Sequence, residues 1–494
     1  MQHIKEHFFS SLMGVSDQGI VKDAALVGGT WTRAEDGSTF DVRNPYDGSV
    51  LIAVSALDGN VARRAIKAAA DALPSWKAML PQERSGLLRR WYELILAARD
   101  DLALITTLEQ GKPIAESLDE IEYGASFVEW FAEEGKRLNA ESVRAHLDDA
   151  HTTVWREPLG VAALFTPWNF PSAMLTRKAA AALAAGCTVV AHVASHAPLS
   201  ALALAELAMR AGIPAGVFNV LTGDAATLGG VLTSDTHVRV VSFTGSTDVG
   251  RKVAAQCSAT HKRIVMELGG NAPLIIFEDA NLSRAVDIAM AAKFATSGQD
   301  CLAANRIYVQ RPLYASFCDA FAQRVDKLKL GFGLDPATDI GPLMHQGAVS
   351  KATRHIEDAL RRGARMLVGD LPSGKTLLVK PTVLVDVHDD AMIMHEESFA
   401  PIAAVTPFES ENEVISKAND TEYGLMAYVV TDNGARALRM ARALEFGMVA
   451  INRAKVTGAS IPFGGVKQSG LGREGSRHGI EAFTDLKYVC QDLN

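Results

Sequence analysis

The sequence predicts an α/β protein in which helices cover both faces of a parallel β-sheet. From Gly160 onward, short apolar runs alternate with longer stretches of helical periodicity. The short runs are apolar at nearly every position, which is typical of strands that are buried on both faces. A chain of 494 residues is also too long for one compact core, so two or three domains are expected.

The composition narrows the possible functions. Hydrophobic residues make up 48% of the chain and charged residues 21%, as in ordinary globular proteins. The net charge of −8 argues against sequence-independent nucleic-acid binding, because such binding needs a basic surface. An apolar patch near the N-terminus is too short and too interrupted for a signal peptide or a membrane span. It consists of Phe8, Phe9, Leu12 and Met13.

The five cysteines are odd in number and widely spaced, at positions 187, 257, 301, 318 and 490. This pattern matches neither a disulfide framework nor paired metal ligands. We therefore expect reduced thiols, a cytoplasmic protein and no metal site.

The N-terminal region changes from strand signals to helical ones. Residues 1–57 are rich in strand and turn signals, with a turn at Asn44–Gly48. Helical periodicity begins at Val61, and Pro81 suits the first turn of a second helix. A long amphipathic helix is predicted over Ile114–Arg137. Its aromatic face is interpreted as core packing and not as a ligand site. That face consists of Tyr123, Phe127, Trp130 and Phe131.

Two segments differ from the rest of the chain. Residues 138–158 are polar and alternate in character around Thr152, Val154 and Arg156. The C-terminal segment Ala482–Asn494 is similar. Both predict extended arms that pack elsewhere, for example on another subunit.

Strands and helices alternate between Gly160 and Glu267. The predicted strands are Val161–Thr166, Thr188–Val193, Val217–Leu221, Val238–Phe243 and Arg263–Glu267. The predicted helices are Met174–Ala185, Leu199–Ala211, Ala225–Leu232 and Asp248–Cys257. Ligands of parallel sheets lie beyond the C-terminal ends of the strands. Three motifs fall at such ends: Thr166–Asn169, Thr244–Thr247 and Glu267–Gly270.

A second α/β region extends from Asn271 to about Ala450. It contains Cys301, in a loop between a predicted helix (Ala285–Ala295) and a predicted strand (Arg306–Gln310). A free cysteine is usually a small buried hydrophobe. The loop position also allows Cys301 to be a nucleophile, and the choice depends on the context that other motifs supply.

These motifs resemble the aldehyde dehydrogenase superfamily, and the resemblance covers nearly the whole chain. The matching segments, in order and spacing, are Pro167–Pro171, Phe243–Thr247, Glu267–Asn271, Gly298–Cys301 and Pro462–Gly465. Within the superfamily the chain looks most similar to NAD(P)-dependent succinate-semialdehyde dehydrogenases. The segments that indicate this are Phe127–Glu134, Thr176–Lys178 and Lys487–Cys490.

The resemblance implies the aldehyde dehydrogenase fold, with a Rossmann-like cofactor domain, an α/β catalytic domain and a β-arm for oligomerisation. The implied cofactor domain comprises residues 1–137 and 159–270, and the catalytic domain residues 271–450. Residues 451–483 return to the cofactor domain and the rim of the substrate site. Residues 138–158 and 484–494 form the implied arms, so a homodimer or a homotetramer is expected.

The resemblance also implies the chemistry. An aldehyde cannot release hydride until it is tetrahedral, so a thiolate must add first, and Cys301 would supply it. The Asn169 amide and the Cys301 backbone N–H would stabilise the oxyanion. Glu267 would act as general base on the hydrolytic water, and Lys178 would assist. A solvated strand-end glutamate and a helix lysine with its amine at the surface are the alternatives for Glu267 and Lys178.

For the cofactor, NAD or NADP, the chain has no Gly-x-Gly-x-x-Gly motif. Gly245 and Ser246 would instead open a helix beneath the pyrophosphate. Glu397 would bind the nicotinamide ribose, with Phe399 beside the ring. The other implied cofactor contacts are Thr166, Pro167, Trp168, His192, Ser195 and Leu268.

Two departures leave the coenzyme preference open. His192 replaces the usual lysine at the adenosine ribose, and histidine is shorter and mostly neutral at pH 7. Ser195 replaces the glutamate that would repel a 2′-phosphate. A further change, Ala400 in place of a glycine, would shift the ribose turn.

The implied substrate is a small aldehyde, such as succinate semialdehyde. Arg177 matches one carboxylate-binding arginine of such enzymes, but Ala295 replaces the other. Phe170, Phe463 and Thr457 would line the site, with Lys455 as a substitute charge. Other semialdehydes and sulfo- or aromatic aldehydes therefore remain alternatives, as does a catalytically impaired relative.

Two residues close to Cys301 also differ from the usual pattern. Asp300 replaces a threonine, and would raise the pKa of Cys301 if it faces the sulfur or only cap the loop if it does not. Ala303 removes a second cysteine, so no redox-switch disulfide is expected.

Overall fold

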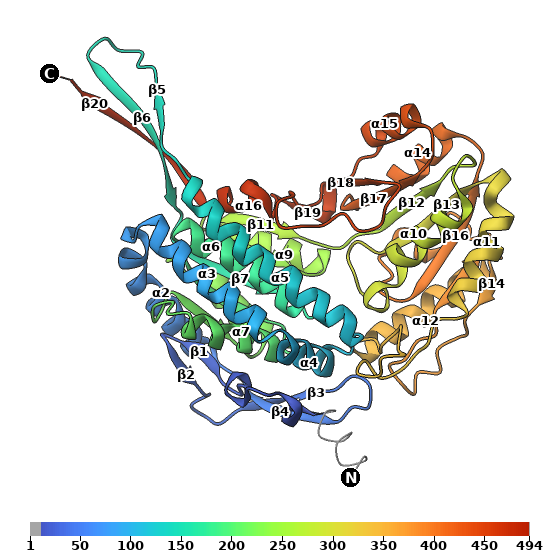
Figure 1. Cartoon of the computed structure of the whole chain (residues 1–494), viewed down its shortest axis with the longest axis horizontal. Helices are drawn as coiled ribbons and strands as arrows, with labels where there is room; N and C mark the ends of the chain where they lie inside the picture. Colours follow the sequence, from blue (N-terminus) through green and yellow to red (C-terminus); the bar gives the residue numbers. More distant parts are fainter. Residues whose placement is uncertain (1–10, 494) are drawn as a thin grey trace.

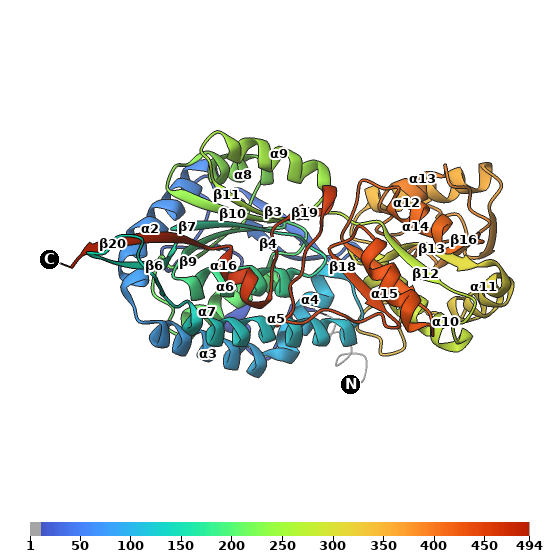
Figure 2. The same cartoon turned by 90° about the horizontal axis from the view of Figure 1, so that it is seen from above.

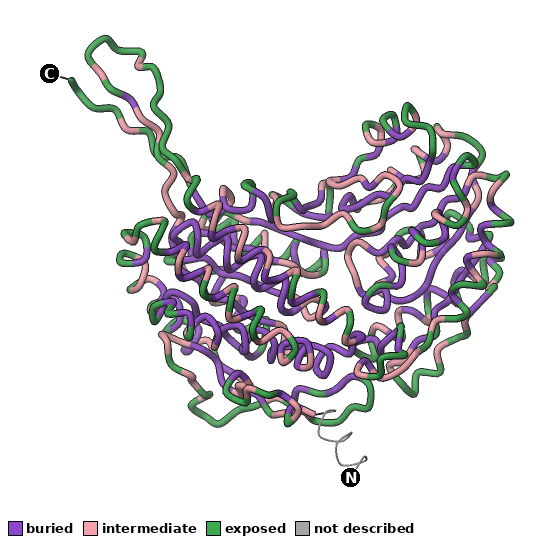
Figure 3. Tube along the Cα trace, viewed as in Figure 1, coloured by how far each residue is buried: buried purple, intermediate pink, exposed green. Residues whose placement is uncertain are grey.

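The computed structural model describes residues 11–493, so Phe8 and Phe9 of the N-terminal patch lie outside the described residues. The chain forms two large sheets that lie side by side, and a narrow arm that projects from one end of the molecule (Figures 1 and 2). Buried residues concentrate in the two sheets and the helices on them, while the arm is mostly exposed (Figure 3).

The first sheet has eight strands in the order β19-β11-β10-β7-β8-β9-β1-β2. The five central strands are parallel to one another, and β1, β2 and β19 are antiparallel to their neighbours. The strands are β1 (Ala25–Val27), β2 (Thr30–Thr32), β7 (Val161–Thr166), β8 (Thr188–Val193), β9 (Phe218–Leu221), β10 (Val238–Thr244), β11 (Arg263–Glu267) and β19 (Gly470–Leu471).

Alternating residues of the central strands enter two separate cores. In β7, Ala162 and Leu164 join one hydrophobic cluster, whereas Val161 and Ala163 join another. This is the period of two of a strand that is covered on both faces.

Two groups of helices cover this sheet (Figures 1 and 2). One group is α2 (Gly59–Ala78), α8 (Ala225–Ser234) and α9 (Thr247–Ser258). The other is α3 (Pro81–Ala97), α4 (Arg99–Gln110), α5 (Ile114–Glu134), α6 (Pro171–Ala185) and α7 (Leu199–Arg210), with the short α16 (Ser476–Glu481) beside α6. Short 3₁₀ turns are η1 (Leu12–Gly14), η2 (Gln18–Ile20), η3 (Gly135–Arg137), η4 (Ala295–Gly298) and η5 (Lys467–Ser469).

The second sheet has seven strands in the order β14-β15-β16-β13-β12-β17-β18, parallel except for β14. They are β12 (Ala272–Ile276), β13 (Ala304–Gln310), β14 (Arg365–Val368), β15 (Thr382–Val385), β16 (Ile402–Phe408), β17 (Met426–Val430) and β18 (Met448–Ile451). The helices here are α10 (Leu282–Phe294), α11 (Arg311–Val325), α12 (Gln346–Arg361), α13 (Met392–His395), α14 (Glu411–Asn419) and α15 (Gly434–Ala443).

The arm is a three-stranded antiparallel sheet in the order β20-β6-β5. It joins the two arm-like segments of the sequence: β5 (Glu141–Val143) and β6 (Ala150–Pro158) pair with the C-terminal β20 (Thr484–Asp492). A separate hairpin, β3 (Thr39–Arg43) and β4 (Val50–Ser55), encloses the predicted turn at Asn44–Gly48.

Several predicted bounds need correction. Helix α6 begins at Pro171 and not at Met174, because proline is well suited to the first helical position. Strand β9 begins at Phe218 and not at Val217. Helix α10 ends at Phe294 and not at Ala295, because the next residues leave the helical conformation: Thr296 and Ser297 have φ angles of 51° and 57°.

Within residues 11–493, no helix is long and apolar enough to cross a membrane. The same residues contain no cluster of three or more His, Cys, Asp or Glu side chains that could hold a metal ion. All five cysteines lie in this range and are free thiols.

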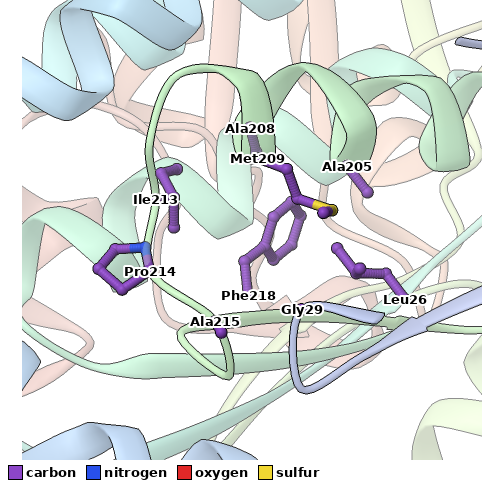
Figure 4. Close-up of a pocket in the computed structure, with 9 residues that line it drawn as sticks. All are labelled: Leu26, Gly29, Ala205, Ala208, Met209, Ile213, Pro214, Ala215 and Phe218. Carbon is purple, nitrogen blue, oxygen red and sulfur yellow. The ribbon is translucent and has the colours of Figure 1, made fainter. Parts of the chain in front are cut away.

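An apolar cavity of about 120 Å³ lies between α7 and the β1–β2 hairpin (Figure 4). Leu26, Met209, Ile213 and Phe218 are among its lining residues. None of the lining side chains is polar or charged, so this cavity offers no group that could orient a ligand or carry out chemistry.

Candidate active site

Cys301 lies in a short loop between η4 and β13, and its side chain is half-buried. The loop is held closely from two sides. A Cβ atom at Gly298, whose φ is +73°, would lie 2.4 Å from the carbonyl oxygen of Ala400, and one at Gly270 would lie 2.3 Å from the carbonyl oxygen of Cys301. Glycine is therefore required at both positions, and the close contacts fix the backbone of the candidate nucleophile.

Asn169 follows β7 and reaches this loop. Its side-chain Nδ2 donates a hydrogen bond to the backbone oxygen of Gln299, at 3.0 Å. Its own backbone oxygen accepts a hydrogen bond from the buried Lys112 amine, at 2.7 Å. A carboxamide nitrogen has two N–H donors. One of them is therefore used to hold the loop, and the other is free for a ligand oxygen.

Glu267 ends β11 and is only 2% exposed. Neither of its carboxylate oxygens has a hydrogen-bond partner. Burial raises the pKa of Glu267 well above its ordinary value, and the nearby Glu474 carboxylate raises it further. An unpaired buried carboxyl group is costly in a purely structural role. Glu267 is thus not a solvated surface glutamate, and its raised pKa suits a base that removes a proton from water.

Glu474 connects three buried side chains beside Glu267. It accepts hydrogen bonds from Lys178 and from Ser242, the latter at 3.2 Å, and it pairs with Arg177 at 2.6 Å. Burial opposes the ionisation of Glu474, but Lys178 and Arg177 outweigh it and hold the pKa of this carboxyl below its ordinary value. Glu474 therefore pairs with both cations, which leaves Glu267 without a direct ion-pair partner.

Lys178 is fully buried, so the alternative of a lysine with its amine at the protein surface is wrong. Its Nζ atom donates to Ser242 at 2.9 Å as well as to Glu474. Burial lowers the pKa of Lys178, while Glu474 opposes that change. Lys178 also lies near enough to Glu267 to lower the pKa of that carboxyl group.

Asp300 combines the two roles that the sequence left as alternatives. Its Oδ1 atom accepts the N–H of Leu302 at 3.0 Å, so it caps the loop. Burial raises the pKa of Cys301 well above its ordinary value, and the Asp300 charge is the next largest cause.

Replacement of Asp300 by asparagine is expected to increase the reactivity of Cys301. Asparagine can still accept the Leu302 N–H, but it removes the negative charge that disfavours the thiolate. The thiolate fraction at a fixed pH should rise, and alkylation by iodoacetamide near pH 8 should become roughly 3- to 10-fold faster. Asp119→Asn, on the exposed side of α5, is the matched control and should not change the rate. An unchanged alkylation rate in Asp300→Asn would contradict this electrostatic effect.

A protein-family model covers most of the chain. The model described as "Aldehyde dehydrogenase family" matches residues 31–489. The chain belongs to the aldehyde dehydrogenase family. This confirms the resemblance seen in the sequence and the predicted fold class. The protein is accordingly an NAD(P)-dependent aldehyde dehydrogenase.

Individual relatives cover nearly the full chain. The enzyme is 49% identical to the NADP⁺-dependent succinate-semialdehyde dehydrogenase of Escherichia coli (strain K12), over 97% of this chain and 100% of the relative. It is 49% identical to a glutarate-semialdehyde dehydrogenase of Pseudomonas putida (strain KT2440), over 97% of this chain and 99% of the relative. A crystal structure of an aldehyde dehydrogenase from Brucella melitensis biovar abortus 2308 has a TM-score of 0.95 and 50% identity, covering 97% and 99% of the two chains.

The enzyme has features that fit a dinucleotide at the ends of its first sheet. Ser246 precedes α9 and makes no side-chain cap, so the first N–H groups of this helix remain available to a phosphate. The Thr244 hydroxyl at the end of β10 is buried without a hydrogen-bond partner. Leu268 packs against the same helix, because a Cβ at Gly250 would lie 2.4 Å from its side chain. Gly245 lies in the turn between Thr244 and Ser246.

The nicotinamide end of the predicted cofactor site lies near Cys301. Glu397 accepts the Gly270 N–H at 2.9 Å, and burial raises its pKa to about 7. Phe399, with a φ of 51°, forms an edge-to-face pair with Trp168, at 5.6 Å between ring centroids. Trp168 follows Thr166 and Pro167 at the end of β7, so this pair joins residues of the first and second sheets.

At the predicted adenosine end of the cofactor site, two polar side chains share one carbonyl oxygen. The His192 Nε2 atom lies 3.3 Å from the Gly223 carbonyl oxygen, and the Ser195 hydroxyl donates to the same oxygen at 3.1 Å. Burial lowers the pKa of His192, so its ring is neutral at pH 7. Neither residue therefore provides the positive charge that usually binds a 2′-phosphate.

Of the predicted substrate residues, Phe463 lies in contact with Arg177. The Arg177 guanidinium group stacks on the Phe463 ring at 4.2 Å, and its Nη1 atom is buried without a hydrogen-bond partner. Phe170 lies against the Lys112 amine, at 4.0 Å. Ala295, in contrast, is exposed.

Tyr123 packs against the first hydrophobic core together with Phe127 and Phe131, as the aromatic face of its helix predicts. Tyr123 is half-buried, and the charges of Arg177 and Asp300 also act on its hydroxyl. Helical periodicity predicts the packing but not this closeness to the site, because the core face and the wall of the site continue along the same helix.

Sequence reasoning also missed three charged residues near the site. Glu474 was part of a recognised glycine-rich segment but had no assigned role. Lys112 pairs with Glu120 at 2.7 Å, and both side chains are fully buried. Glu116 accepts the Thr296 N–H with both oxygens at 3.0 Å, and so holds the start of η4. Their positions in the sequence were the available clue. Lys112 lies in the break before the long helix, and Glu116 lies just after it.

Proposed function

We propose that the enzyme oxidises a small semialdehyde, such as succinate semialdehyde, to the carboxylate through a covalent adduct on Cys301. The observation that carries this proposal is Glu267, a buried carboxyl group with no hydrogen-bond partner, whose charge also raises the pKa of Cys301. The charge of Glu267 acts on Cys301, so the base lies near the nucleophile. A base in this position can activate water to hydrolyse a thioester on that nucleophile.

In the first step, the Cys301 thiolate attacks the aldehyde carbon. The free N–H of the Asn169 amide and the backbone N–H of Cys301 are positioned to stabilise the resulting oxyanion. Bound NAD or NADP supplies the hydride acceptor. Loss of hydride from the tetrahedral adduct leaves a thioester on Cys301.

In the second step, Glu267 removes a proton from water, which then attacks the thioester. Both oxygens of Glu267 are free to accept a hydrogen bond from that water. Glu474 holds Lys178 and Arg177, so these cations assist electrostatically without consuming the lone pairs of the base. A general base is needed here, which favours hydrolysis over transfer of the acyl group to another thiol.

We propose that the regions of the two sheets have different roles. Residues 1–137 and 159–270 would bind the cofactor, and residues 271–450 would carry Cys301. Residues 451–483 would return to the cofactor domain and form part of the rim of the substrate site. Glu397 and Phe399 belong to the second region but would contact the nicotinamide ribose and ring. Their closeness to the cysteine loop supports this, since the Glu397 charge also raises the pKa of Cys301.

For the substrate, Arg177 is the proposed carboxylate anchor, because its buried Nη1 atom lacks a partner. The acidic substrates of the two relatives support the same choice: succinate semialdehyde for one and glutarate semialdehyde for the other. Ala295 removes a second arginine, and this favours other aldehydes as the second candidates.

The test is the formation of reduced cofactor from an aldehyde panel with NAD and with NADP. Succinate semialdehyde should be oxidised with a kcat/KM at least about tenfold above that of butanal, as expected for one charge-assisted anchor. No turnover of any aldehyde with either cofactor would refute the enzymatic proposal. Equal values for the two aldehydes would refute the acidic substrate but not aldehyde oxidation.

The coenzyme preference can be tested at His192. His192→Lys places a positive charge where a 2′-phosphate is expected, so the Kd for NADP should fall roughly tenfold and the Kd for NAD should change much less. Fluorescence titration of the free enzyme measures both constants. His146→Lys, in the exposed arm, adds the same charge elsewhere and serves as the control. Unchanged NADP affinity in His192→Lys would show that the 2′-phosphate does not approach this residue.

We also propose that the arm holds subunits together in a homodimer or homotetramer. Leu486 and Tyr488 lie on the same face of β20 and are 57% and 56% exposed. Exposed apolar side chains on an edge strand are typical of an interface.

Replacement of both Leu486 and Tyr488 by aspartate should reduce the molar mass measured by light scattering to that of a monomer. Gln491→Asp, on the opposite face of the same strand, should leave the oligomer intact. A wild-type monomer, or a double variant with the wild-type mass, would contradict a role of the arm in assembly.

A further inference from the structure

The buried ion pair between Lys112 and Glu120 takes no part in the two steps proposed above. Both side chains are fully buried, and the Lys112 Nζ atom lies 2.7 Å from the Glu120 Oε2 atom. Taking two charges out of water is costly, so such a pair needs further hydrogen bonds on each side. These further bonds lead to the turn that carries Asn169.

Lys112 holds the backbone of Asn169 itself. Its Nζ atom donates to the Asn169 backbone oxygen at 2.7 Å and lies 4.0 Å from the centre of the Phe170 ring. Together with the bond to Glu120, these contacts use the three N–H donors of the ammonium group. Asn169 needs this support, because residues 167–170 lie between β7 and α6 in neither strand nor helix.

Glu120 holds the other side of the same turn. Its Oε1 atom accepts the backbone N–H groups of Ser172, at 2.9 Å, and of Ala173, at 3.2 Å. These are donors in the first turn of α6, which receives no side-chain cap from its own N-cap residue, Phe170. The ion pair therefore fixes both ends of the turn that carries Asn169.

The backbone next to Lys112 is also in close contact with the segment that supports the nucleophile loop. A Cβ atom on Gly341 would overlap the Gly111 carbonyl oxygen, so the two backbones touch. The Gly341 carbonyl oxygen also accepts the Ser297 hydroxyl, at 2.9 Å, in the stretch that leads to the nucleophile. The turn of Asn169 and the nucleophile loop are thus held against one segment, which sets the distance between them.

We propose that Lys112 and Glu120 are positioning residues, which place the Asn169 amide at the distance from the Cys301 backbone N–H that a tetrahedral oxyanion requires. This rests on the part of the proposed function in which Cys301 adds to a carbonyl carbon and Asn169 stabilises the product. A donor is effective only when it is aimed at the oxygen of the adduct, and a shift on the order of 1 Å can cost about 10²-fold in rate. In this role neither charged side chain contacts the substrate.

The test removes the pair without leaving a buried charge. In Lys112→Met/Glu120→Gln, methionine fills the space of the lysine stem, and the new amide oxygen can still accept the N–H groups of α6. The net charge near Cys301 is unchanged, because one charge of each sign is lost. Three reactions of Cys301 are then compared: oxidation of succinate semialdehyde, acylation by 4-nitrophenyl acetate and alkylation by iodoacetamide.

The first two reactions pass through a tetrahedral oxyanion and the third does not. In acylation the thiolate adds to the ester carbonyl and 4-nitrophenolate leaves, whereas in alkylation the thiolate displaces iodide from a saturated carbon. We expect kcat/KM for oxidation and the rate of acylation each to fall at least about tenfold, and the rate of alkylation to change less than about twofold. Cys301→Ala measures the contribution of the other thiols, which is subtracted.

A double-mutant cycle tests whether the pair acts through Asn169. Asn169→Ala removes the amide donor but keeps the backbone oxygen to which Lys112 is bonded. Added to Asn169→Ala, the Lys112→Met/Glu120→Gln change should slow acylation by less than about threefold further, because the donor that the pair positions is already gone. Losses that multiply independently would overturn the positioning role.

Two further double variants complete the design. Lys67→Met/Asp71→Asn removes an ion pair of the same length, 2.7 Å, from the exposed side of α2 and should leave all three rates unchanged. Lys112→Gln/Glu120→Gln fills the buried space with two amides, but the new side chain at position 112 is one bond shorter than lysine. It should show the same losses, and it replaces the methionine variant if that variant has a lowered melting temperature or no longer binds NAD.

The possible results separate this inference from the proposed function. Wild-type rates of oxidation and acylation in the variants of the buried pair would overturn the positioning role and leave the proposed function intact. A loss of alkylation as large as the loss of acylation would also overturn it, because the pair would then act on the thiol. A wild-type enzyme that oxidises no aldehyde would refute the proposed function, and the acylation rates would still decide the role of the pair.

Discussion

Replacement of Cys301 by alanine is expected to lower kcat/KM for every aldehyde by at least about 10⁴-fold. Alanine cannot add to the aldehyde, and an aldehyde that remains planar cannot release hydride. The side chain is half-buried in a loop that close backbone contacts hold in place, so its loss should not unfold the enzyme. Cofactor binding is expected to persist, because the proposed contacts of the dinucleotide lie mainly on β7, β10 and α9.

The measurement is steady-state formation of reduced cofactor, with the wild-type enzyme and two alanine variants. Cys490→Ala removes the exposed thiol of the arm and should retain full activity. Cys301→Ala should also lose the slow labelling of Cys301 by iodoacetamide, whereas Cys490→Ala should retain it. Appreciable turnover in Cys301→Ala would exclude a covalent mechanism through this residue.

Replacement of Glu267 by glutamine should separate hydride transfer from hydrolysis. The first turnover still forms reduced cofactor, because thiolate addition and hydride transfer do not require the base. Hydrolysis of the thioester then lacks a proton acceptor, so steady-state turnover should fall by about 10²- to 10⁴-fold. A rapid burst of one equivalent of reduced cofactor per subunit, followed by a slow phase, is the expected time course.

Stopped-flow absorbance measures the burst, and mass spectrometry of the quenched enzyme should detect the acyl group on Cys301. Glu278→Gln, at an exposed position after β12, is the matched control and should show no burst. The wild-type steady-state rate should rise with pH as Glu267 loses its proton, and this dependence should vanish in the glutamine variant. A variant with a normal steady-state rate would show that another group activates the water.

Much of the central fold was predictable from local sequence. Strands β7 and β8 span Val161–Thr166 and Thr188–Val193, as predicted. Each is a mainly apolar run that starts within two residues of a glycine, either Gly160 or Gly186, so both the pattern and the boundary were clear. The boundary of α6 was less clear, since Pro171 is compatible with both a turn and the first position of a helix.

The candidate site was predictable only where its residues belong to recognised motifs. Asn169, Glu267 and Cys301 were identified in this way. The link between Glu267 and Glu474 was not, because it depends on the antiparallel pairing of Glu267 with Gly470 across β11 and β19. A two-residue strand gives almost no periodic signal. The closeness of Tyr123 to the site was missed for a related reason, since Arg177, whose charge acts on its hydroxyl, is distant in sequence.

The backbone before the nucleophile has a consequence for how this enzyme can evolve. Thr296 and Ser297 both have positive φ angles, which cost residues with side chains roughly 1–3 kcal/mol each. The bonds from Glu116 to the Thr296 N–H and from Ser297 to the Gly341 carbonyl hold this conformation. Glycine at either position would relax the backbone and stabilise the fold, but it would also loosen the segment that leads to Cys301. Selection for heat resistance and selection for turnover would therefore act in opposite directions on these two residues.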